Sequence, residues 1–67
     1  MKNLKRFLGK RVKIKVAKNN EYIGQVNGYV SAIDNEPELE EINIINERDN
    51  KGYSLFETEI IDIEILD

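Results

Sequence analysis

Carboxylates are the side chains in this 67-residue chain with the clearest capacity for chemistry. One acidic loop carries five of them: Asp34, Glu36, Glu38, Glu40 and Glu41. Such a loop could supply the oxygen ligands that Ca²⁺ or Mg²⁺ prefers, and the neighbouring Glu57 and Glu59 could perform acid–base work. The loop spacing matches no cation-binding motif such as the EF-hand, and Pro37 stiffens the loop. The pattern therefore favours a solvated acidic loop over a metal site.

The chain contains no histidine and no cysteine. This composition excludes disulfides, thiolate or imidazole zinc sites, and nucleophiles that depend on a histidine base. A small all-β domain also offers no large pocket in which paired carboxylates could act on a substrate. The sequence therefore predicts a protein that is not an enzyme and that needs no cofactor.

The charges divide the chain into two unequal parts. Residues 1–20 hold eight of the ten basic side chains and no acid, whereas residues 21–67 hold all thirteen acids against two basic residues, a net charge of −11. A basic arm of this kind could bind nucleic acid or another anionic surface. Alternatively, a basic strand lies beside acidic strands and cross-strand pairs neutralise both. The acidity of the remaining surface favours the second interpretation.

Two periodicities in the apolar residues predict the elements. Leu4, Phe7 and Leu8 follow a helical spacing, which predicts a short helix over about residues 2–8 that ends at Gly9. A period of two then predicts five strands at about residues 10–17, 21–33, 39–45, 53–57 and 59–66. One short helix and five short strands indicate a single all-β domain, residues 1–67, with the fold of a small SH3-like antiparallel barrel.

Alternation within the strands also predicts which side chains face the core. It places Tyr22 and Val26 on the inner face of the second strand and Tyr29 on the opposite face, and it makes Ile61, Ile63 and Ile65 one face of the last strand. Gly24 and Gly28 inside the second strand indicate strong bending or a close approach of backbones. Apolar residues surplus to the core predict a self-association surface that includes Tyr53, Leu55, Phe56, Ile60 and Leu66.

The predicted helix and two segments of the first strands carry a resemblance to a known family. The predicted helix, the segment Leu8-Gly9-Lys10-Arg11-Val12-Lys13-Ile14 and the segment Tyr22-Ile23-Gly24-Gln25-Val26-Asn27-Gly28-Tyr29 together resemble the first signature of the Sm-like (LSm) family. The resemblance covers nearly the whole chain in the order and length of its elements. It implies a strongly bent five-stranded sheet capped by the helix, rings assembled through the fourth and fifth strands, and RNA held by two loops.

The sequence departs from this family at the residues that contact RNA. Val30 stands where the family has an Asp, and Asp34 stands where the family has an Asn that hydrogen-bonds a base. Glu57 stands where the second signature would supply Arg-Gly, and its carboxylate would repel a phosphate. The resemblance therefore implies the scaffold of the family without its usual RNA pocket.

Three functions follow as hypotheses. The leading one is a non-enzymatic, cytoplasmic module without a membrane partner, which self-associates through edge strands into a scaffold or protein-binding ring. The alternative is an RNA-binding protein with a divergent site built from cations of the N-terminal helix, namely Lys2, Lys5, Arg6 and Lys10. The third is a monomeric peptide binder that uses Tyr22, Tyr29 and Tyr53.

Overall fold

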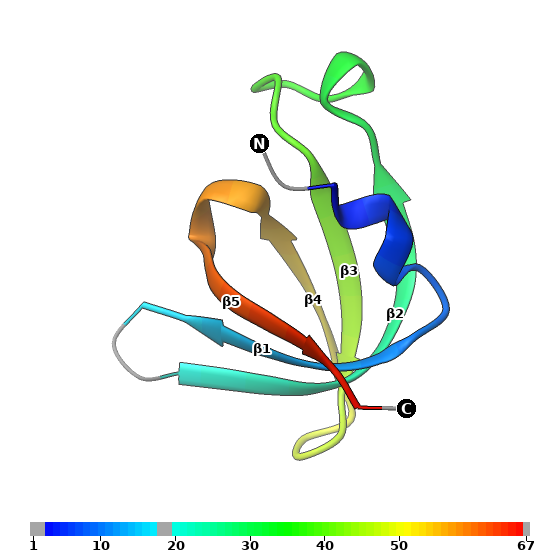
Figure 1. Ribbon diagram of the computed structural model, residues 1–67, viewed down its shortest axis with the longest axis vertical. Coiled ribbons are helices and arrows are strands. Elements are labelled where there is room, and N and C mark those ends of the chain that lie inside the picture. Colours follow the sequence, from blue (N-terminus) through cyan, green and yellow to red (C-terminus); the bar gives the residue numbers. More distant parts are fainter. Residues whose placement is uncertain (1–2, 18–19, 67) are drawn as a thin grey trace.

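The protein is a single five-stranded antiparallel sheet with three short 3-10 turns (Figure 1). The computed structural model describes residues 3–17 and 20–66. The elements are η1 (Leu4–Phe7), β1 (Arg11–Val16), β2 (Asn20–Val30), η2 (Ala32–Asp34), β3 (Glu41–Asn46), β4 (Lys51–Phe56), η3 (Glu57–Glu59) and β5 (Ile60–Ile65). The predicted all-β class is confirmed, and each strand begins and ends within three residues of the range that alternation predicts.

The sheet curves strongly but does not close into a complete barrel. Its strand order is β4-β3-β2-β1-β5, so β4 and β5 are the two edge strands, and the short η3 turn joins them (Figure 1). The expected N-terminal helix is a 3-10 helix of four residues rather than a two-turn α-helix. So short a helix depends on docking for its stability. No helix in residues 3–17 and 20–66 is both long enough and apolar enough to cross a membrane.

The core lies on the concave face of the sheet, beneath η1. Leu4 and Phe7 are the two buried residues of η1, which contacts β2 and β3. The strands complete the core with Val12, Ile14, Val16, Val26, Ile42, Ile44, Leu55 and Ile60. In β1 and in most of β3 the buried residues alternate as the period of two predicts, because each of these strands buries one face only.

An irregularity in β2 reverses one predicted facing. The pairing of β2 with β3 shifts between Val26 and Gly28, after which Tyr29 lies opposite Ile42. A shift of one residue moves every later side chain to the other face of a strand. Tyr29 therefore packs against the core together with Tyr22 and Tyr53, and its predicted placement on the opposite face is wrong.

A second irregularity lies at the start of β5. Val16 pairs with Ile60 and Lys15 pairs with Asp62, so Ile61 is an extra residue between the two pairs. Ile60 is consequently buried, and Ile61 is 61% exposed. The prediction that Ile61 shares the inner face is wrong, because strand alternation does not anticipate an inserted residue.

Basic residues of β1 lie beside acidic residues, as the second interpretation of the charge division predicts. In the register of β1 with β5, Lys13 lies opposite Glu64 and Lys15 lies opposite Asp62. Arg11 instead forms a bidentate ion pair with Glu47, in the turn between β3 and β4, with N–O distances of 2.7 and 3.0 Å. Opposite charges on β1 and its neighbouring strands therefore lie side by side, and Lys13 forms an ion pair with Glu21 of β2 at 3.8 Å.

Candidate functional site

The two edge strands present unpaired backbone groups to solvent. The Leu66 amide donates to the Arg11 carbonyl at 2.8 Å, which fixes the direction of the amides along β5. Since amides alternate in direction along an antiparallel strand, those of Ile63 and Ile65 point away from β1. Within residues 3–17 and 20–66 neither amide has an acceptor, so both can bond a further strand.

The edge of β4 is free over part of its length. The Glu57 amide donates to the Glu40 carbonyl at 2.8 Å, and the register of β3 with β4 then directs the amides of Gly52 and Ser54 away from β3. The Phe56 amide also points outward, but it donates to Oε1 of Glu59 at 2.9 Å. The side chain of Glu59 therefore caps the end of this edge, and the segment from Gly52 to Ser54 remains open.

The structure divides the predicted self-association residues between core and surface. Leu55 and Ile60 are 5% and 4% exposed and belong to the core, so little of either side chain is available to a strand of a neighbouring copy. The other predicted residues, Tyr53 and Phe56, are half-buried at the edge strand, and Leu66 is exposed. Strand alternation missed two further exposed side chains on β5, namely Ile61 and Ile65. A glycine is the sequence signal that could have indicated a bulge at this point and hence the exposure of Ile61. The chain has no glycine at or beside Ile61.

The predicted cation site lies on a different part of the molecule. Lys5 and Arg6 are exposed on η1, and Lys10 is exposed just before β1, while Lys2 lies outside the described residues. The guanidinium carbon of Arg6 lies 4.7 Å from the centre of the Phe7 ring, within range of a cation–π contact. Within residues 3–17 and 20–66, these three cations take part in no ion pair.

The acidic loop contains one residue that is not solvated. Glu40 is only 8% exposed. Its Oε1 accepts a hydrogen bond from the Leu4 amide at 3.1 Å, and its Oε2 accepts one from the Tyr29 hydroxyl at 2.6 Å. The prediction of a fully solvated loop is wrong at this residue, because a carboxylate with two donors can be buried where an unpaired one cannot.

The acidic residues of the described part of the chain do not assemble into a metal site. Among the described residues, no three carboxylates come close enough together to hold a metal ion.

Glu57 lies close enough to Tyr29 to affect the ionisation of the Tyr29 hydroxyl. Oε2 of Glu57 is buried and has no hydrogen-bond partner in the described part of the chain. Glu40, Tyr29 and Glu57 therefore form a half-buried acidic cluster whose hydrogen bonds fasten η1 to the sheet.

This cluster gives the protein a pH dependence in alkali. The hydrogen bond to Glu40, the burial of the ring and the negative charges of Glu40 and Glu57 raise the pKa of Tyr29 from 10.0 to about 12. Between these two pH values the folded chain keeps a proton that the unfolded chain releases, so the free energy of unfolding falls as the pH rises. We expect denaturant titrations to show this loss between about pH 10 and 12, and Tyr29→Phe to reduce it. An equal slope in Tyr29→Phe would contradict the assignment.

Comparison of the chain with protein-family models, with curated proteins and with solved structures finds no match. The resemblance to the Sm-like family stays a prediction from the residues that carry it. The features of this chain that bear on its function are the two sheet edges, the exposed cations of η1 and the exposed apolar surface of β5.

Proposed function

We propose that this chain is a non-enzymatic Sm-like module that forms homo-oligomers through β4 and β5 and acts as a scaffold or protein-binding ring. The observation that carries the proposal is the open sheet, whose two edge strands each point backbone amides outward. Unpaired edges of this kind are templates for pairing with another chain. A contact between β4 of one copy and β5 of the next is heterologous, and such contacts generate rings when the rotation closes.

The side chains along the edges support this pairing. Gly52 and Ser54 are small and exposed, so a neighbouring strand can approach the open part of β4 closely. Ile61, Ile65 and Leu66 leave apolar surface exposed on and just after β5, which a neighbour would cover. Lys51 at the start of β4 and the exposed acids of β5 also carry opposite charges, which favours a β4-to-β5 contact over two like edges.

The size of the domain gives a further reason. A domain of about this length buries only about 60% of the surface that its unfolded chain exposes, so its own core provides modest stability. The chain has no cysteine for disulfides. Association of folded copies would stabilise the folded state by mass action.

Native mass spectrometry and sedimentation velocity test this proposal. We expect the protein to appear as a multiple of its 7.8 kDa chain mass and the double variant Ile61→Lys, Ile65→Lys to appear as single chains, because two buried charges at a strand contact oppose association. Ile33→Lys is the matched control, since Ile33 is 84% exposed but lies on η2, away from both edges. A monomeric parent protein at high micromolar concentration would refute the proposal.

A second candidate function is RNA binding by the cations of η1. The observation that favours it is that Lys5, Arg6 and Lys10 are exposed and have no acidic partner among the described residues. Phosphate contacts of this kind bind without reading sequence and weaken steeply with salt. RNA that co-purifies with the protein, recorded in the same native mass spectra at low salt, would favour this candidate.

A further inference from the structure

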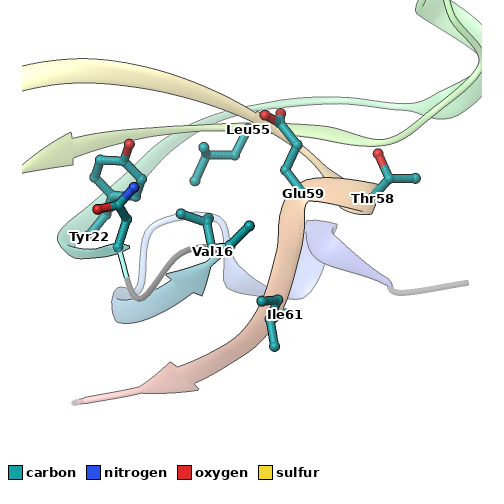
Figure 2. Close-up of a pocket in the computed structure, with 8 residues that line it drawn as sticks. Val16, Tyr22, Leu55, Thr58, Glu59 and Ile61 are labelled. Atoms are coloured by element: carbon teal, nitrogen blue, oxygen red, sulfur yellow. The ribbon is translucent and has the colours of Figure 1, made fainter.

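A surface hollow of about 360 Å³ lies where the turn end of the β1–β2 hairpin meets the turn between β4 and β5 (Figure 2). Its lining comes from three separate segments of the chain: Val16, Ala17, Asn20 and Tyr22, then Leu55, then Thr58, Glu59 and Ile61. The volume is at the small end of the range for ligand pockets, which suits a ligand of few atoms. None of its described lining residues belongs to the acidic cluster or to the cations of η1.

The middle of the hollow is apolar and firmly held. Val16 and Leu55 belong to the core, and their side chains lie between the two ends of the hollow (Figure 2). The ring of Tyr22 packs against the ring of Tyr53 with the centroids 4.7 Å apart, which restricts its movement. Ile61, pushed outward by the bulge, adds an exposed apolar wall. These surfaces would contact an aliphatic chain.

The polar groups of the hollow lie at its ends. Tyr22 is at one end, and Thr58 and Glu59 are at the other (Figure 2). Oε1 of Glu59 is held by the Phe56 amide at 2.9 Å, and no other partner of this carboxylate is found among the described residues. The lining residues that the structure describes include no basic side chain. Glu59 thus gives this part of the hollow a positioned negative charge.

We propose that this hollow binds a short aliphatic chain that ends in an ammonium or guanidinium group, about the size of a lysine or arginine side chain. The stem lies against Val16, Leu55 and Ile61, and the cationic group bonds the free oxygen of Glu59. Because the Phe56 amide already orients this carboxylate, binding requires little reorganisation of the protein. The acid-rich composition of residues 21–67 attracts cationic ligands to this part of the chain. The hollow shares Ile61 with the surface that a neighbouring copy would cover, so association through β5 would compete with binding of this ligand.

Titration by two-dimensional NMR with three ligands of equal stem length tests the chemistry of the hollow. We expect pentylammonium to produce saturable shifts in the amide signals of Tyr22, Leu55, Thr58 and Ile61, and 1-pentanol and hexanoate to bind much more weakly. The reason is that only the ammonium group forms a charge-assisted hydrogen bond with the carboxylate. Equal binding of the three ligands, or no saturable shift at these residues, would overturn the proposal.

Glu59→Gln isolates the contribution of the charge, because its side-chain carbonyl can still accept the hydrogen bond from the Phe56 amide. We expect it to weaken pentylammonium binding about tenfold, the effect of losing one hydrogen bond to a charged group. Glu36→Gln is the matched control, since it removes the same charge from an exposed loop, and it should leave binding unchanged. Equal affinity of the Glu59→Gln and Glu36→Gln variants would also overturn the proposal.

A second ligand distinguishes a free amine from a protein side chain as the natural source of the cation. Nα-acetyl-lysine methylamide carries the same head and stem on a peptide backbone. If it binds at least as well as pentylammonium, the hollow accepts a lysine of a polypeptide. If only pentylammonium binds, the hollow accepts free aliphatic amines. Binding of either ligand with the expected response to Glu59→Gln supports the proposal, and failure of both removes it.

Discussion

Gly24→Ala is expected to remove most or all of the folding stability of this protein. Gly24 is buried in β2, and a Cβ atom added there would lie 1.8 Å from the carbonyl oxygen of Ile45 and 2.9 Å from its carbonyl carbon. These are backbone atoms of β3, which is hydrogen-bonded to strands on both sides and cannot withdraw without breaking the sheet. We expect a loss of at least about 3 kcal/mol from overpacking. A domain of this length has a total stability of only about 3–10 kcal/mol.

Gly28→Ala is the matched control for this prediction, in the same strand four residues later. Its added Cβ atom would lie 2.6 Å from Nδ2 of Asn43, a side-chain atom that can rotate away at the cost of disturbing the Ser54–Asn43 hydrogen bond. We expect a loss of about 1 kcal/mol here. Circular dichroism during urea titration measures both variants. A Gly24→Ala protein that is as stable as Gly28→Ala would show that β2 and β3 can separate at this point.

Gly24 also illustrates what could be predicted from the sequence. A glycine inside a strand of otherwise alternating residues indicates bending or close backbone approach, and the structure confirms that approach at Gly24. The core residues of β1 follow equally directly, because Val12, Ile14 and Val16 alternate with basic residues that remain at the surface. Patterns of this kind depend only on neighbours along the chain, and the sequence contains that information.

The bulges could not be predicted in the same way. The shift after Val26 and the extra residue at Ile61 depend on how two strands pair, so they are settled by contacts between segments distant in sequence. Each shift changes the candidate surfaces: Tyr29 moves towards the core, Ile60 leaves the predicted self-association surface, and Ile61 becomes a wall of the hollow. The alternation of apolar residues therefore predicts the ranges of the strands better than it predicts which face each side chain occupies.

The positions of the residues in the candidate site depend even more on tertiary structure. The order of the strands places β4 and β5 at the two edges, but whether a curved sheet closes between them depends on its total curvature, which alternation does not determine. Glu40 similarly looked like one acid among five in a polar loop. Its burial requires donors from Leu4 and Tyr29, which precede it by 36 and 11 residues. The sequence provided each of these residues but no local sign that they meet.

Glu40→Ala is expected to destabilise the protein by about 3 kcal/mol, since it removes two hydrogen bonds to a charged group. The carboxylate is the acceptor for both the Leu4 amide and the Tyr29 hydroxyl. Its loss therefore removes one hydrogen bond to η1 and one to β2. Leu4 and Phe7 are buried only while η1 is docked on the sheet. The first consequence should therefore be local: the N-terminal turn opens before the strands separate.

Hydrogen exchange distinguishes this mechanism from general destabilisation. In Glu40→Ala, we expect the Leu4 and Lys10 amides to exchange much faster than the amides of β1 and β3, because the Lys10 amide depends on the Phe7 carbonyl of the same turn. Glu38→Ala removes an exposed carboxylate of the same loop and should change stability by less than about 0.5 kcal/mol. If Glu40→Ala behaved like Glu38→Ala, the hydrogen bonds of Glu40 would contribute no net stability, and η1 would be held by the packing of Leu4 and Phe7 alone.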